Sequence, residues 1–187
     1  MKLHRLVPSK TLVAVIDAQE ALAAAMPPER ISQLVRNIGI LLSGAKVLGA
    51  DVVATEQYPK GLGKTLPPLA AKLTDLNVVP IEKTAFSAVD VPELLSRVEA
   101  VSPAAVVIVG MEAHVCVYQT ARDLVNRGLD VYVAIDAVCS RREEDRATGI
   151  ALCERAGATR TTTEAVVFDW LQRAGTDAFR TMSKLVR

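Results

Sequence analysis

Three polar residues of the sequence, Asp17, Lys83 and Cys116, are of types that together support covalent catalysis. Each of them follows an apolar run that predicts a buried strand. A cysteine sulfur can attack a carbonyl carbon, a carboxylate can accept the thiol proton, and an ammonium can stabilise negative charge. Ligands of open α/β sheets bind where loops leave the carboxyl ends of the strands, which is where we expect these side chains to lie.

Each of the three also has a plainer interpretation. Asp17 could be a loop or helix-capping carboxylate, Lys83 a surface lysine, and Cys116 a packed structural thiol, since cysteine is among the most buried residue types. For Cys116, a strand predicted to end at Gly110 is followed by a turn and a helix that begins near Val115. A helix start offers N–H groups to an oxyanion and favours a thiolate, so this position suits a nucleophile.

Apolar runs alternate with amphipathic segments along the whole chain. The strongest runs are continuous in Val, Ile and Ala, as in strands that are covered on both faces. This alternation predicts an α/β fold in one domain over residues 1–187, with a mostly parallel sheet and helices on both of its faces. The expected strands are 11–16, 51–55, 77–81, 104–109, 130–135 and 158–162, and the expected helices 27–49, 91–100, 115–128 and 143–157. The Gly- and Pro-rich stretch 56–76 is expected to be the longest loop-like segment, with one or two helical turns inside it, and is a candidate wall of the pocket.

The bulk composition excludes several classes of partner. The 22 basic and 21 acidic side chains give a net charge of +1, so we expect neither a nucleic-acid nor a membrane-surface partner. No apolar run approaches the ~20 residues that cross a bilayer, and the N-terminal segment lacks the pattern of a secretory signal. The three cysteines have no framework spacing, which favours a reducing, cytoplasmic location.

Four motifs resemble the isochorismatase-like cysteine hydrolase family, and within it the isochorismatase-domain-containing group. They are D-A-Q at 17–19, K-T-A-F-S at 83–87, G-M-E-A-H-V-C-V at 110–117 and RGLDVYVAIDAVCSR at 127–141. The resemblance spans about residues 10–170. It implies a three-layer αβα fold with a doubly wound, six-stranded, mostly parallel sheet, a small-molecule substrate and an Asp-Lys-Cys triad.

The resemblance also implies a role for each residue. Asp17 would accept the thiol proton and later activate water, and Lys83 would orient Asp17 and help to stabilise the thiolate. Cys116 would attack a carbonyl carbon to give a thioester that water hydrolyses. The backbone N–H groups of Glu112 and Cys116 would hold the oxyanion, and the Met111–Glu112 peptide bond is expected to be cis.

Two departures from other members of the family narrow the expected chemistry. Nicotinamidases of this family bind a metal through an aspartate and histidines in the loop after the second strand, but that loop here reads TEQYPKG, and the only histidines of the chain are His4 and His114. We therefore expect no metal or other cofactor, and no nicotinamidase activity. Isochorismatases that cleave an enol ether dispense with the cysteine, so Cys116 favours hydrolysis of an amide or related acyl compound.

The remaining expectations rest on location alone. His114 could act as a general base, but its place in the turn favours a structural or hydrogen-bonding role. Cys139 and Cys153 are interpreted as packing residues, and Trp170 as covering the core or an oligomer interface. Residues that could line the substrate pocket are Gln19, Gln57, Tyr58, Phe86, His114 and Tyr118.

Three further interpretations stay open. The chain could be a binding or scaffold protein that keeps the fold without turnover, or Cys116 could be a redox-sensing thiol. A homo-oligomer, either a dimer or a tetramer, is expected because the Val- and Ala-rich helices offer apolar faces.

Overall fold

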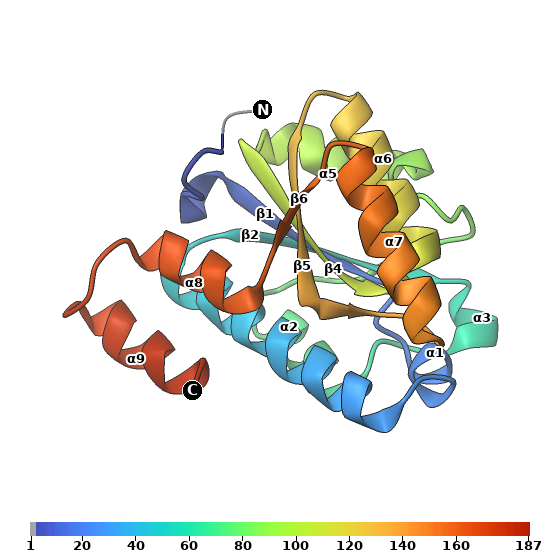
Figure 1. Cartoon of the computed structure of the whole chain (residues 1–187), viewed down its shortest axis with the longest axis horizontal. Coiled ribbons are helices and arrows are strands. Elements are labelled where there is room, and N and C mark those ends of the chain that lie inside the picture. The colour runs from blue at the N-terminus through green and yellow to red at the C-terminus, as the bar shows by residue number, and fades with distance from the viewer. Residues whose placement is uncertain (1–2) are drawn as a thin grey trace.

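The computed structural model describes residues 3–187, which form one parallel sheet covered by helices on both faces (Figure 1). The order of the strands in the sheet is β3-β2-β1-β4-β5-β6, and every pair is parallel. This is the predicted three-layer, doubly wound αβα fold. The strands β2 and β3 are added on one side of β1, and the chain then returns to add β4, β5 and β6 on its other side, so the topological switch point lies between β1 and β4. The strands are β1 (Thr11–Ile16), β2 (Asp51–Gln57), β3 (Ile81–Lys83), β4 (Ala105–Met111), β5 (Asp130–Cys139) and β6 (Thr159–Thr161).

Two groups of helices form the outer layers. The residues of α2, α4, α8 and α9 contribute to the core on one side of the sheet, and those of α5, α6 and α7 to the core on the other. Within residues 3–187, no helix is long and apolar enough to cross a bilayer. The helices are α1 (Glu20–Ala24), α2 (Pro28–Leu48), α3 (Pro59–Leu62), α4 (Pro67–Thr74), α5 (Pro92–Val101), α6 (Tyr118–Asn126), α7 (Glu143–Arg155), α8 (Thr163–Leu171) and α9 (Asp177–Leu185). Short turns are the 3-10 helices η1 (Pro8–Lys10) and η2 (Ala88–Asp90) and a π-helical turn, η3 (Ala113–Val117).

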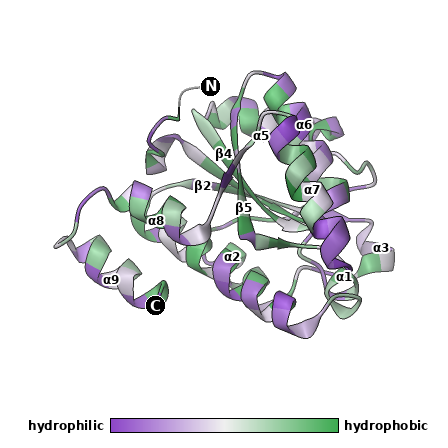
Figure 2. Ribbon diagram, viewed as in Figure 1, coloured by the Kyte–Doolittle hydropathy of each residue, from purple (hydrophilic) through white to green (hydrophobic). Residues whose placement is uncertain are grey.

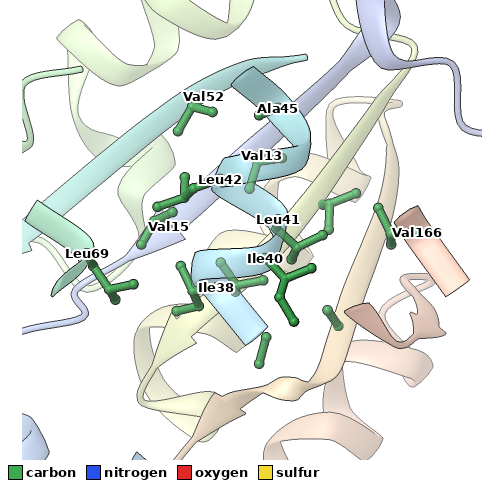
Figure 3. Packing of buried hydrophobic residues seen from close by; sticks show 14 of the residues in the cluster. Val13, Val15, Ile38, Ile40, Leu41, Leu42, Ala45, Val52, Leu69 and Val166 are labelled. Carbon is green, nitrogen blue, oxygen red and sulfur yellow. The ribbon is translucent and has the colours of Figure 1, made fainter. Parts of the chain in front are cut away.

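The core follows from the continuous apolar strands, which Figure 2 shows as hydrophobic ribbons at the centre of the molecule. All six residues of β1 are buried, and alternate side chains face opposite layers. Val13 and Val15 pack against Ile38, Leu41 and Leu42 of α2 and their neighbours (Figure 3). The other three apolar side chains of β1 belong to the second cluster. Burial on both faces fixes the strand, and with it the position of Asp17 at its end.

The indole of Trp170 belongs to the core. Its side chain is 2% exposed, and Nε1 donates a hydrogen bond to Thr11 Oγ1 at 3.3 Å. Of the two positions predicted for this residue, the structure therefore has the core. Cys139 and Cys153 are buried at the end of β5 and in α7, as expected for packing residues.

Several segments differ from the sequence-based expectation, including β5, which runs to Cys139 instead of ending at residue 135. The third strand covers 81–83 instead of 77–81, because Asn77 adopts a left-handed backbone (φ 56°) and ends the turn after α4. Lys83 is therefore the last residue of a strand and does not follow one. Residues 56–76 contain the expected helical turns as α3 and α4, each with proline in its first turn. Leu69 and Leu73 of α4 are buried in the core beside α2.

Candidate active site

Asp17 and Cys116 meet at the topological switch point of the sheet, because β1 and β4 are neighbours there. Asp17 follows β1 with a left-handed backbone (φ 48°), and Cys116 lies in η3 directly after β4. The close approach of the two strand ends depends on Gly110, whose φ is 121°. A Cβ at this position would lie 1.9 Å from the carbonyl oxygen of Ile16, so only glycine fits.

The carboxylate of Asp17 and the ammonium of Lys83 form a buried ion pair. Lys83 Nζ lies 2.7 Å from Asp17 Oδ2, and neither side chain is exposed to solvent. Asp17 Oδ1 accepts a hydrogen bond from the hydroxyl of Thr55 at 2.7 Å. The ammonium is close to Oδ2 without being aligned as its hydrogen-bond donor, so among the described residues Oδ2 remains free as a hydrogen-bond acceptor.

The ammonium of Lys83 is held by further acceptors that surround it. It donates to Gln57 Oε1 at 2.6 Å, and to the carbonyl oxygens of Ala85 at 3.1 Å and Phe86 at 3.2 Å. Two of these acceptors belong to the chain that leaves β3, and Gln57 ends the neighbouring strand β2. A buried charge is tolerated only when it is paired and hydrogen-bonded, and this set of partners meets that condition.

The Cys116 thiol is 6% exposed and lies against the ion pair. Burial, and next the charge of Asp17, raise the pKa of this thiol to about 12, although Lys83 acts in the opposite direction. The proton therefore stays on the sulfur at neutral pH. Lys83 lowers the pKa of the thiol, as expected, but desolvation and the Asp17 carboxylate outweigh it, so the expected net lowering of this pKa is not found.

Hydrogen bonds and an ion pair hold the turn that carries Cys116 in place. The Met111–Glu112 peptide bond is cis, as expected, and the Glu112 carbonyl accepts hydrogen bonds from the N–H groups of Val115 at 3.1 Å and Val117 at 3.2 Å. Instead of the predicted α-helix starting near Val115, residues 113–117 form a π-helical turn before α6. The Glu112 carboxylate pairs with Arg141 Nε at 2.8 Å.

Ser140 and Gly149 hold the same turn from neighbouring elements. Ser140 Oγ accepts the N–H of Ala113 at 3.1 Å and lies 3.1 Å from His114 Nδ1. His114 thus makes a structural contact, as its place in the turn had favoured. A Cβ on Gly149 of α7 would lie 2.4 Å from the carbonyl carbon of Ala113, so the helix packs directly against the turn.

Thr55, Ser140 and Gly149 are contacts of the site that sequence reasoning missed. Thr55 and Ser140 look like ordinary strand and loop hydroxyls, and their contacts depend on which strands are neighbours. Gly149 offered a signal, because a glycine inside a helix is unfavourable and often marks close packing.

Apart from His114, which contacts Ser140, the residues expected to line a substrate pocket divide into two sets. Gln19 is fully buried, and its amide bonds the backbone of Gln57 and the carbonyl oxygen of Gly63, so it ties down the chain after β2. Gln57 is directed to Lys83 and donates to the carbonyl oxygen of Thr84 at 2.8 Å. The structure thus places both glutamines in the scaffold of the site.

The aromatic candidates lie nearer the surface. Tyr58 and Phe86 are 54% and 55% exposed. Tyr118 begins α6, and the guanidinium of Arg122 lies over its ring at 5.5 Å. Tyr58 borders a hollow of about 330 Å³ together with residues 59–60 and 82–84. A role of these aromatic side chains in substrate binding stays a prediction.

The segment after β2 does not fit the metal site of nicotinamidases. It offers one carboxylate, Glu56, whose Oε1 accepts from the backbone N–H and hydroxyl of Thr65 and whose Oε2 pairs with Lys64. Over residues 3–187, no cluster of three or more His, Cys, Asp or Glu side chains could hold an ion. The oxygens of Glu56 are therefore committed to structural hydrogen bonds.

The all-parallel, doubly wound sheet with these polar side chains at its switch point defines the class of three-layer αβα proteins that bind small ligands at this edge of the sheet. The sequence profile of the isochorismatase domain matches residues 11–165, and the chain belongs to the isochorismatase family of hydrolases. Isochorismatase domain-containing protein 2 of Bos taurus is 34% identical over 187 residues, which cover 99% of this chain and 87% of that protein.

Two solved structures extend the comparison. The MAR1 ribonuclease of Caenorhabditis elegans has a TM-score of 0.90 and 36% identity, covering 98% of this chain and 92% of its own. The YcaC gene product of Escherichia coli, described as an octameric hydrolase of unknown specificity, has a TM-score of 0.88 and 23% identity, with 99% and 92% covered. At that identity, the likeness to YcaC shows the fold alone.

Proposed function

We propose that this chain is a cofactor-free cysteine hydrolase that acts on small-molecule amides or related acyl compounds through a thioester intermediate. The observation that carries the proposal is the contact of the Cys116 thiol with the Asp17–Lys83 ion pair at the switch point. A carboxylate that keeps acceptor capacity beside a protonated sulfur is the arrangement that general-base activation of a nucleophile requires.

In the first half-reaction, Cys116 Sγ attacks the carbonyl carbon while its proton moves to Asp17. Since the thiol keeps its proton at neutral pH, proton transfer must accompany the attack. The C–N bond then breaks, and the amine takes the proton from Asp17 as it leaves. Lys83 stabilises the negative charge that passes between sulfur and carboxylate.

In the second half-reaction, Asp17 removes a proton from a water molecule as its oxygen attacks the thioester carbonyl. The C–S bond breaks, the acid product leaves, and the proton returns from Asp17 to the sulfur. The N–H groups of Glu112 and Cys116 are proposed to hold the oxyanion in both halves, which is worth about 10²–10³ in kcat for one donor. The turn between them is held by Ser140 and Gly149.

A panel of small primary amides and acyl compounds tests this mechanism. We expect the variants Cys116→Ser and Asp17→Asn to lose turnover, and a mass increase on Cys116 to appear during turnover of the wild type. Cys153→Ser is the control, because burial raises the pKa of the Cys153 thiol to about 12 as well, but it lies in α7. Unchanged turnover in Cys116→Ser or Asp17→Asn contradicts the mechanism.

A ribonuclease is the second candidate, because a solved structure with 36% identity is named MAR1 ribonuclease. RNA binding relies on Lys and Arg to neutralise phosphates, and the net charge of +1 makes amide hydrolysis the first choice. Incubating RNA with the wild type and with Cys116→Ser separates the two: cleavage that depends on Cys116 would favour the ribonuclease.

The binding-protein and redox-sensor interpretations make a different prediction for the thiol. A redox-sensing cysteine is exposed and has a lowered pKa, whereas burial raises the pKa of Cys116. A reversible sulfenate on Cys116 after mild peroxide would favour the sensor. Equal labelling of Cys116 and Cys153 by an acyl-type electrophile, without turnover, would favour a binding protein.

We also propose that the protein is a cytoplasmic homo-oligomer, either a dimer or a tetramer. All three cysteines are free, which suits a reducing compartment. Light scattering after size-exclusion chromatography measures the assembly, and an octamer like that described for YcaC is the alternative.

A further inference from the structure

Thr55 makes reciprocal contacts with Asp17 from the neighbouring strand. Its hydroxyl donates to Asp17 Oδ1 at 2.7 Å, and the N–H of Asp17 donates to the Thr55 carbonyl oxygen at 3.2 Å, with Thr55 Oγ1 3.3 Å away. The side chain is 1% exposed, and β2 lies between β1 and β3. Thr55 therefore contacts the acid of the site and no solvent.

We infer that Thr55 is a positioning residue of the proposed hydrolase, whose hydroxyl occupies Oδ1 of Asp17 and so directs Oδ2 to Lys83 and Cys116. The inference rests on the proposed function, since it concerns the orientation of the Asp17 carboxylate, which is the base of that reaction. It assigns the two carboxylate oxygens different tasks: Oδ1 is the anchored atom and Oδ2 is the one that takes the proton.

The strand geometry explains why a threonine suits this position. Side chains two residues apart point to the same face of a strand, so Thr55 and Gln57 lie on one face of β2. Thr55 contacts Asp17, which follows β1, and Gln57 contacts Lys83, which ends β3. A β-branched residue also has restricted rotation about χ1, which holds the hydroxyl in one place. One strand thus holds both members of the ion pair.

A second buried threonine provides a matched control. Thr65 donates its hydroxyl to Glu56 Oε1 at 2.8 Å, and Thr65 and Glu56 are each 4% exposed. The chemistry is the same as in the Thr55–Asp17 pair, a hydroxyl bonded to a buried carboxylate, but neither Thr65 nor Glu56 belongs to the proposed machinery. Substitution by valine removes the hydroxyl from either threonine with little change of shape.

The experiment compares full-length Thr55→Val, Thr55→Ser and Thr65→Val with the wild type. For the amide that the panel identifies, we expect Thr55→Val to lower kcat by roughly 10- to 100-fold, as expected for one lost hydrogen bond to a charged group, with KM little changed. Thr55→Ser, which keeps the hydroxyl, should recover most of the loss. Thr65→Val should leave kcat within about twofold of the wild type, even if it unfolds more easily.

A second readout needs no substrate. The rate at which iodoacetamide labels Cys116, followed by mass spectrometry from pH 6 to 10, reports the state of the thiol beside Asp17. We expect Thr55→Val to displace this profile in the same direction as Asp17→Asn, and Thr65→Val to leave it in place. If Thr55→Val has the kcat and the labelling profile of the wild type, the inference is overturned. It is also overturned if Thr65→Val lowers kcat as much as Thr55→Val does.

The two readouts separate failure of this inference from failure of the proposed function. If the wild type hydrolyses no amide, the proposed function fails, and the labelling profiles still decide whether Thr55 acts on Asp17. If Thr55→Val does not fold, Thr55→Ser decides the matter: a kcat as low as that of Asp17→Asn in a folded Thr55→Ser protein overturns the inference, and retained kcat supports it.

Discussion

Lys83 Nζ lies 2.7 Å from Asp17 Oδ2, and both side chains are completely removed from solvent. Burying two charges costs several kcal/mol for each ion, which only close pairing and further hydrogen bonds offset. Here Thr55 supplies a donor to the carboxylate, and Gln57, Ala85 and Phe86 supply acceptors to the ammonium. The pair is thus a structural unit as well as the proposed catalytic one, and the two roles are separable by experiment.

We predict that Lys83→Met destabilises the protein by about 3–5 kcal/mol, because it leaves the Asp17 carboxylate buried without a cation. The double variant Asp17→Asn/Lys83→Met should be more stable than Lys83→Met alone, since no uncompensated charge remains. The measurement is the free energy of unfolding in urea for the wild type, both single variants and the double variant.

Lys64→Met is the control for this cycle. Lys64 also pairs with carboxylates, Glu56 at 3.1 Å and Glu82 at 3.3 Å, but its side chain is 67% exposed. We expect its loss to leave the free energy of unfolding nearly unchanged, because solvent-exposed ion pairs contribute little to stability. Additive effects of the two substitutions in the Asp17–Lys83 cycle would show that the buried pair is not coupled.

A second prediction concerns the contact of α7 with the nucleophile turn. A methyl group at Gly149 would meet the backbone of Ala113 at 2.4 Å, so Gly149→Ala must push the helix and the turn apart. We expect a loss of about 1–3 kcal/mol in stability and a fall in turnover. Thermal unfolding and kcat measured on the same preparation check both effects.

Gly39→Ala is the matched substitution inside another helix. A methyl group at Gly39 would meet only the flexible end of the Lys72 side chain, at 3.3 Å. We expect a change in stability of less than about 1 kcal/mol, in the stabilising direction, because alanine is the better helix former. If Gly149→Ala behaves like Gly39→Ala, the packing of α7 does not hold the turn.

The sequence was sufficient to predict the elements whose burial is complete. The runs that became β1 and β4 are continuous and apolar, and each is followed by the chemically distinctive residue of the site, Asp17 or Cys116. One mostly apolar run was placed wrongly, because the left-handed backbone of Asn77 keeps its first residues in a turn. The run at 77–81 was placed in a strand, although only Ile81 belongs to β3.

Other features depend on contacts between strands that are distant in sequence. Thr55 reaches Asp17 only because β2 lies beside β1, an order that no local pattern reveals. The raised pKa of the Cys116 thiol likewise results from burial and from Asp17, which lies 99 positions earlier in the chain. The helix start after β4 predicted a lowered pKa for this thiol instead. Sequence alone could not correct that prediction, because it does not give the solvent exposure of the sulfur.

A third prediction is that the protein loses stability in alkali. Burial raises the pKa of Cys116 and of Cys153 from 9.0 to about 12. A thiol that holds its proton longer in the folded state contributes its full stability below the unfolded pKa and loses it as the pH rises from about 9 toward 12. Each such thiol should lower the free energy of unfolding by about 1.4 kcal/mol per pH unit in that window.

Chemical denaturation at pH 8, 9 and 10 measures this slope. The comparison is between the wild type and Cys153→Ala, which removes one titrating thiol away from the proposed machinery. Although the substitution lowers stability at every pH, the slope above pH 9 should become less steep. An unchanged slope would mean that the thiol of Cys153 does not have a raised pKa in the folded protein.

The last prediction concerns acid and the Glu56–Thr65 pair. Burial opposes ionisation of Glu56, but the N–H and hydroxyl of Thr65, with Lys64, outweigh it and lower the pKa of this carboxyl. Its contribution to stability is therefore present above the unfolded pKa of 4.5 and lost as the pH falls through the lower folded value. Thr65→Val should cost about 1–3 kcal/mol at pH 7 and distinctly less near pH 3 in urea denaturation. A difference that stays constant with pH would show that the hydroxyl does not stabilise the ionised form.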